Sequence, residues 1–188
     1  MATSRSNDQG AAPDRGAQTF GHNGVHPGRW TAEVTEPMVV FLIGMRVNKL
    51  LKIRQWWITR AMPRMLHRLA EVPELGLLHV EGFTRGRTSL MVQYWRSFDH
   101  LERFARDPDV PHLDAWRRWN RQIRNSGDVG FWHETYVVEP GSIEAVYGNM
   151  PPFGLAAATA LVPAGKVGQS AGHRLDPSRP DAVPVQPY

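Results

Sequence analysis

Residues 109–138, DVPHLDAWRRWNRQIRNSGDVGFWHETYVV, join a helical pattern to a strand pattern, and the rest of the chain can be interpreted from them. At 100° per residue, one helix face within about 60° collects His112, Trp116, Trp119 and Ile123. The opposite side carries Arg117, Arg121 and Arg124. We therefore expect a helix that packs its histidine and tryptophans inward against a sheet.

His112 falls in the first turn of this predicted helix, directly after Pro111. Unsatisfied backbone N–H groups and the helix dipole disfavour a positively charged ring at that position. A neutral imidazole can act as a base, a hydrogen-bond acceptor or a metal ligand. The structural alternative is that His112 only caps or packs the start of the helix.

The chain has 188 residues, which suffice for one domain with a hydrophobic core. Residues 1–29 are rich in Gly, Ser, Asn, Asp and Pro, and they are predicted to be a disordered arm. Residues 165–188 are rich in Pro, Gly and Ser, and they are predicted to be a flexible tail. A single domain is expected over residues 30–164.

The charge balance is mildly basic, with 22 basic and 18 acidic residues. No basic run is interleaved with aromatic residues in the manner of a nucleic-acid groove, so no nucleic-acid partner is expected. The chain has no cysteine, which excludes disulfides, thiolate metal sites and a cysteine nucleophile. We assign no metal site.

The first 29 residues contain no apolar segment of the secretory type, which predicts a cytoplasmic protein. Residues 38–45 are strongly apolar, but a run of about eight residues is too short to cross a bilayer. This run is better explained as a strand buried on both faces, and no membrane partner is expected.

The expected elements follow the order strand, helix, strand, strand, helix, helix, strand. They cover residues 37–48, 56–72, 77–84, 88–96, 98–106, the helix after 109 and a strand through 138. This order predicts an α+β protein of the ferredoxin-like, split βαβ class, with its helices on one face of an antiparallel sheet. Because the strands are apolar on both sides, we expect a homodimer with sheets packed face to face.

The predicted pocket lies between the sheet and its own helices, with Trp95, Met91 and the helix tryptophans as apolar walls. Arg96 is a polar group among aromatics, which favours a partner or a ligand for its side chain. Strand alternation places His133 and Glu134 on opposite faces, and the sequence leaves open which of them faces the pocket. A structural alternative for either residue is a bond to Arg46 or Arg96 across the sheet.

Four segments resemble a known family: residues 93–98, His112 with Trp116 and Asn120, residues 132–136, and residues 147–155. Over about 37–163 the chain is similar to the monooxygenase-like family named after a fungal fumagillin-pathway monooxygenase, within the antibiotic-biosynthesis monooxygenase class. The resemblance implies the dimeric α+β barrel fold. The wider class includes oxygenases without a prosthetic group, haem-degrading enzymes, haem dehydratases acting on aldoximes, and non-catalytic binders.

Three functional hypotheses follow. The leading one is a monooxygenase-like enzyme that oxidises a small apolar or polycyclic molecule, with His112 as base or hydrogen-bond partner and Asn120 and Tyr147 orienting the substrate. Since no cofactor motif is present, the substrate itself would supply the electrons. The second makes His112 or His133 the axial ligand of a haem. The third is a non-catalytic accessory protein of a biosynthetic pathway.

Overall fold

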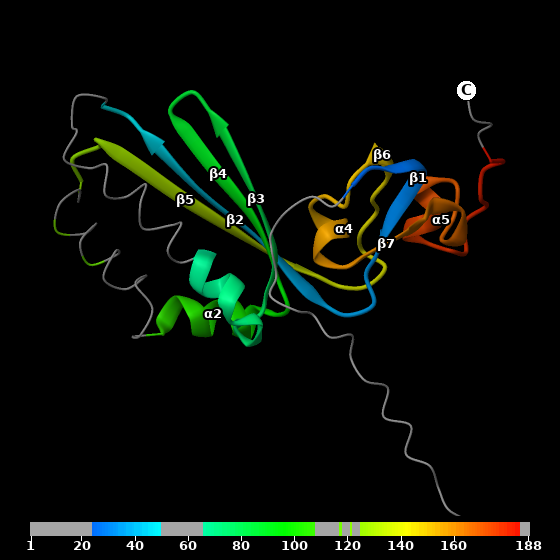
Figure 1. The fold of residues 1–188 in the computed structure, drawn as a ribbon, viewed down its shortest axis with the longest axis horizontal. Helices are drawn as coiled ribbons and strands as arrows, with labels where there is room; N and C mark the ends of the chain where they lie inside the picture. The colour runs from blue at the N-terminus through cyan, green and yellow to red at the C-terminus, as the bar shows by residue number, and fades with distance from the viewer. Residues whose placement is uncertain (1–23, 50–65, 108–116, 118–120, 122–124, 185–188) are drawn as a thin grey trace, which may run out of the picture.

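The computed structural model describes residues 24–49, 66–107, 117, 121 and 125–184. Within these ranges, the chain forms two antiparallel sheets that lie side by side along the long axis of the molecule (Figure 1). The larger sheet has the strand order β3-β4-β2-β5, and the smaller one has the order β6-β1-β7.

The larger sheet comprises β2 (Met38–Val47), β3 (Leu77–Arg85), β4 (Thr88–Trp95) and β5 (Val129–Val138). The smaller sheet comprises β1 (His26–Glu33), β6 (Tyr147–Met150) and β7 (Ala160–Pro163). The helical elements are η2 (Pro73–Leu75), α2 (Phe98–Arg106), α4 (Leu155–Ala158), η3 (Ala164–Lys166) and α5 (Ala171–Leu175), and residues 66–71 are also helical.

The larger sheet confirms the predicted α+β, ferredoxin-like arrangement. Strand β2 occupies an inner position and pairs antiparallel with both β4 and β5 over nearly its whole length. The β3–β4 hairpin turns at Arg85–Thr88, as the sequence predicted. An inner strand with two covered edges and two apolar faces accounts for the continuous apolar run in β2.

Helices cover one face of this sheet. Ser97 caps the start of helix α2, because its side chain accepts a hydrogen bond from the backbone N–H of His100. Its buried Leu101 and Phe104 pack against the fully buried Trp95 of β4. The cluster that forms the core on this face consists of Val39, Leu69, Leu77, Trp95, Leu101 and Phe104.

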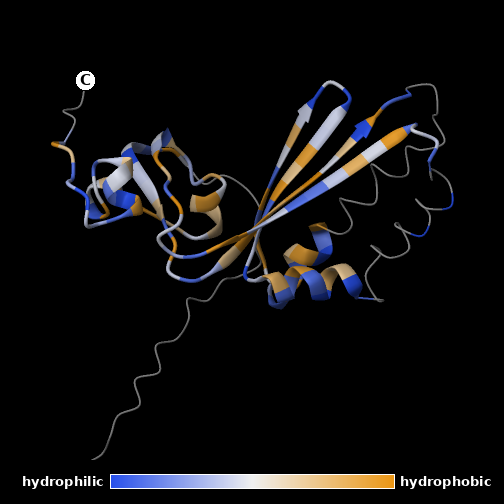
Figure 2. Cartoon of the chain, turned by 180° about the vertical axis from the view of Figure 1, so that it is seen from behind, coloured by the Kyte–Doolittle hydropathy of each residue, from blue (hydrophilic) through white to orange (hydrophobic). Residues whose placement is uncertain are grey.

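The opposite face of the larger sheet, which we call the open face, is covered at one end by α4, whose Leu155 and Ala158 pack with Met38 and Tyr94. Over the rest of this face the described residues place no helix (Figures 1 and 2). Because neighbouring side chains alternate along a strand, Val40 and Leu42 point to the open face while Val39 and Phe41 point to the helices. The half-buried apolar side chains of the open face are Val40, Leu42, Leu90, Val92 and Trp132.

The smaller sheet was not predicted as a unit. Its first strand begins at His26, within the segment expected to be an arm, and its other strands are four residues long. Such short strands bounded by Gly and Pro give a weak period-2 signal. A cluster of Met38, Leu155 and Ala158 joins this sheet to the larger one.

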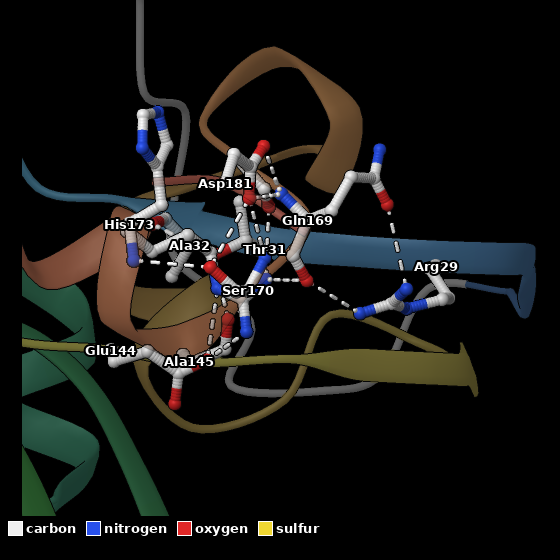
Figure 3. Close-up of polar contacts among 11 residues, drawn as sticks. Arg29, Thr31, Ala32, Glu144, Ala145, Gln169, Ser170, His173 and Asp181 are labelled. Carbon is white, nitrogen blue, oxygen red and sulfur yellow. Dashed lines mark hydrogen bonds and ion pairs between the residues drawn. The ribbon is translucent and has the colours of Figure 1, made fainter. Parts of the chain in front are cut away.

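Residues 165–184 pack on the smaller sheet (Figure 3). Arg174, with a side chain only 5% exposed, forms an ion pair with Glu144 and donates to the carbonyl oxygens of Gly168 and Gln169. Asp181 accepts hydrogen bonds from the backbone N–H groups ahead of α5, which lowers its pKa to about 2. The division of the chain at residues 30 and 164 stays a prediction.

No helix within the described ranges combines the length and the apolar character that crossing a membrane requires.

We expect Arg174→Ala to lower the free energy of unfolding by about 3 kcal/mol, because it leaves a partly buried carboxylate and two carbonyls without their donor. Arg179→Ala is the matched control, since the Arg179 side chain is 66% exposed in its pair with Asp176. Its expected cost is below about 1 kcal/mol. Urea unfolding of the two variants measures the difference, and equal midpoints would show that the C-terminal segment does not support the fold.

Candidate functional site

Four predicted site residues, His112, Trp116, Trp119 and Asn120, lie outside the described residues. The same predicted helix is represented by Arg117 and Arg121, which are helical and exposed. Both belong to the side that the sequence assigned to solvent. The role of His112 therefore stays a prediction.

Trp95 is completely buried on the helix-covered face. Its indole Nε1 donates to Gln93 Oε1 over 2.9 Å, and its ring lies 5.4 Å from that of Phe104. Met91 is half-buried on the same strand and pairs with Ile43 of β2. The polar partner of the Trp95 indole is thus Gln93, a polar residue among aromatics for which the sequence favoured a partner or a ligand.

Arg96 follows the end of β4 and is exposed. Its backbone N–H donates to the carbonyl oxygen of Gly76 over 2.8 Å, which ties the strand end to η2. The side chain of Arg96 therefore extends from the rim of the sheet.

The structure decides which face each residue of the His133-Glu134 pair takes. His133 pairs with Ile43, and its ring lies 5.6 Å from Phe41, so it projects to the helix-covered face. Glu134 pairs with Leu42 on the open face and accepts a 2.5 Å hydrogen bond from the Tyr136 hydroxyl. His133 is thus an imidazole on the side where the sequence placed the pocket.

The structural alternative of a bond to Arg46 is not what the structure shows. Arg46 donates to the side chains of Asn48 and Thr88 at the far end of β2.

A second polar group lies on the opposite face of the larger sheet, and sequence analysis did not single it out. His79 and Glu81 of β3 are 4% and 8% exposed, and their Nε2 and Oε1 atoms are 2.8 Å apart. The same Glu81 oxygen accepts a hydrogen bond from the backbone N–H of Gly154 over 3.2 Å. Two polar residues spaced i, i+2 in an otherwise apolar strand were the available signal.

Tyr94 and Tyr147 lie beside this pair. The ring of Tyr94 is 6.3 Å from that of His79, and the Tyr147 hydroxyl accepts a hydrogen bond from the backbone N–H of Ala156 over 3.2 Å. Burial, aided by the nearby Tyr147 and Glu81, raises the pKa of Tyr94 to about 12. Burial also raises the pKa of Tyr147. Both phenols are therefore neutral at physiological pH.

The predicted site residues thus divide between the two faces of the sheet. Trp95, Met91 and His133 lie on the helix-covered face. Tyr147 belongs to the smaller sheet and lies near Tyr94, whose side chain joins the cluster of Met38, Leu155 and Ala158. Across the part of the chain that the structure describes, no group of three or more potential metal ligands occurs.

The four-stranded antiparallel sheet with helices on one face defines an α+β protein of the ferredoxin-like class. The chain belongs to the monooxygenase af470-like family, whose sequence model matches residues 38–155. That range begins with β2 and ends at the start of α4, so it includes both polar groups described above.

A curated relative, monooxygenase af470 of Aspergillus fumigatus, is 28% identical over 148 residues, and the match covers 72% of this chain and 50% of the relative. Two solved aldoxime dehydratases, one in complex with butyraldoxime, superpose with TM-scores of 0.58 and 0.57 at 17% and 19% identity. The superposed regions cover 77% and 76% of this chain, and 45% of each aldoxime dehydratase. At this sequence identity the similarity shows the fold alone. The chain spans about half the length of these proteins.

We expect Tyr94→Phe to flatten the loss of stability at alkaline pH. A phenol in the unfolded chain ionises near pH ~10, whereas the folded protein holds the pKa of Tyr94 at about 12. The stabilisation is complete below the unfolded value and is lost as the pH rises toward the folded value. Thermal unfolding of wild type and variant between pH 9 and pH 12 measures this, and parallel curves would contradict it.

Proposed function

We propose that this protein is a monooxygenase-like enzyme that oxidises a small apolar or polycyclic molecule on the helix-covered face of its larger sheet. The observation that carries the proposal is the position of His133 on that face, within the segment that matches the family. An apolar surface with a single titratable ring is the usual composition of a pocket for an apolar metabolite. The ring supplies the polar contact that orients the substrate.

Four described residues of this face have distinct parts in the proposal. Phe41 and Met91 are half-buried and offer apolar contact. Trp95 is fully buried on the same face, where it bonds to Gln93 and packs against Phe104. His133, exposed at the edge strand, holds or accepts a proton of an acidic substrate group.

The remaining part of the proposed pocket comes from the sequence. His112 is the base or hydrogen-bond partner, Asn120 orients the substrate, and Trp116 and Trp119 complete the apolar walls.

A haem enzyme is the second candidate, and the aldoxime dehydratases of the same fold favour it. His133 fits such a group, because an imidazole beside an apolar surface is a common axial donor for haem iron. A bound haem would supply the chemistry for dehydration, isomerisation or oxygen activation. His133, or His112 in its place, would hold the iron, and Phe41 would supply apolar surface beside His133.

We further propose that a second copy of the chain covers the open face. The open face carries a contiguous set of apolar side chains: Val40, Leu42, Leu90, Val92 and Trp132. Soluble monomers rarely leave so large an apolar patch uncovered. A two-fold dimer with the two open faces in contact would cover these side chains.

We expect the purified protein to show no Soret band and to consume oxygen with electron-rich polycyclic phenols. His133→Ala should reduce the rate about 100-fold, which is within the usual contribution of an acid–base group. His67→Ala is the control, since the imidazole of His67 is exposed and bonds to Glu71 on a helix. Oxygen-electrode rates and absorption spectra of the three proteins provide the measurement.

A Soret band that His133→Ala removes and His67→Ala retains would replace the cofactor-free hypothesis with the haem one. A protein with neither a Soret band nor oxygen consumption would support the non-catalytic accessory role.

We expect Leu42→Glu to convert a dimer into a monomer, because it places a charge in the middle of the open face. Val137→Glu, at a residue 65% exposed on the helix-covered side of β5, should remain dimeric. Sedimentation velocity measures the difference. A wild-type protein that sediments as a monomer would disprove the dimer.

A further inference from the structure

Two tyrosines from different sheets meet the same short stretch of backbone. Tyr94 comes from β4, and its hydroxyl would lie 3.0 Å from a Cβ placed on Gly154. Tyr147 comes from β6, and its hydroxyl accepts the N–H of Ala156 over 3.2 Å. The two phenols also interact electrostatically with each other. Their hydroxyl groups therefore lie at one junction, where the smaller sheet meets the open face.

Both phenols retain a hydrogen to donate. The Tyr147 oxygen accepts from Ala156, which leaves its own O–H free of that bond. The Tyr94 hydroxyl has no hydrogen-bond partner among the described residues. It is also not fully buried, so a ligand or water can reach it. Because neutral phenols are single donors, the junction presents two O–H groups without a protein acceptor in this part of the chain.

The backbone at Gly154 fixes the position of these donors. Its φ of 56° and ψ of −118° belong to a region that L side chains rarely adopt. This conformation directs the Gly154 N–H to the Glu81 carboxylate, and it leaves the space that the Tyr94 hydroxyl uses. The buried Glu81, bonded also to His79, anchors the stretch to β3. The donors are therefore held before any ligand arrives.

The surroundings select the charge and the polarity of a ligand. The cluster of Met38, Leu155 and Ala158, against which Tyr94 packs, provides an apolar wall. Phe83 and Phe153, with rings 6.3 Å apart, extend that wall along β3. The carboxylate of Glu81 lies in the same group, so a second negative charge would be repelled.

We propose that Tyr94 and Tyr147 form a binding site for the carbonyl oxygen of a neutral, largely apolar ligand. A carbonyl oxygen has two lone pairs and can accept from both hydroxyls at once, while its apolar body lies against the Leu155 cluster. The site is separate from the one proposed around His133, because the two lie on opposite faces of the larger sheet.

The test uses three bicyclic probes of similar size: 1-indanone, which has a neutral carbonyl, indane, which has none, and indane-1-carboxylate, which is anionic. Ligand-observed NMR measures their affinities for the full-length protein. We expect 1-indanone to bind at least about tenfold more tightly than indane, and more tightly than the carboxylate.

Tyr94→Phe and Tyr147→Phe should each weaken 1-indanone about fivefold and leave indane unchanged, as expected for the loss of one hydrogen bond. Tyr136→Phe is the matched control, because its hydroxyl bonds to Glu134 elsewhere on the sheet. Circular dichroism and melting temperatures establish that the three variants are folded. Equal affinities for 1-indanone and indane, absence of binding, or a loss shared by Tyr136→Phe would each overturn the proposal and leave the two hydroxyls to water.

Discussion

The fold depends on β2, a strand that is apolar on both faces and hydrogen-bonded on both edges. Burying such a strand requires partner strands on each side and cover on each face, so its position fixes β4, β5 and the helices together. The Val39 face receives Trp95 and α2, which form the main core. The Leu42 face receives α4 and the edge of the smaller sheet near Met38, and the proposed second copy of the chain would cover the rest.

Strand alternation turns this single constraint into two chemically different surfaces. On β4, Trp95 points to the helices while Tyr94 points to the open face. On β5, His133 and Glu134 divide in the same way. The helix-covered surface therefore holds His133 beside Phe41, and the open face holds the His79–Glu81 pair beside Tyr94. The helix-covered surface supports the proposed oxidation site at His133, and the open face supports the proposed carbonyl site at Tyr94. The two proposals are independent of each other.

The family match supports the monooxygenase-like class, and the structural neighbours support the fold. Both concern relatives of about twice the length. The proposed dimer accounts for the apolar side chains of the open face that the described helices leave uncovered.

The sequence by itself determined the features that depend on neighbours along the chain: the helix over 98–106, the successive strands β3 and β4, the doubly apolar β2, and from their order the ferredoxin-like class. It also showed that His133 and Glu134 must face opposite ways. Only the tertiary structure decided that His133 takes the helix-covered side, because that choice follows from its pairing with β2. The same holds for the approach of Tyr147 to Tyr94 and for the smaller sheet, since both join segments far apart in the sequence through contacts that no local periodicity encodes.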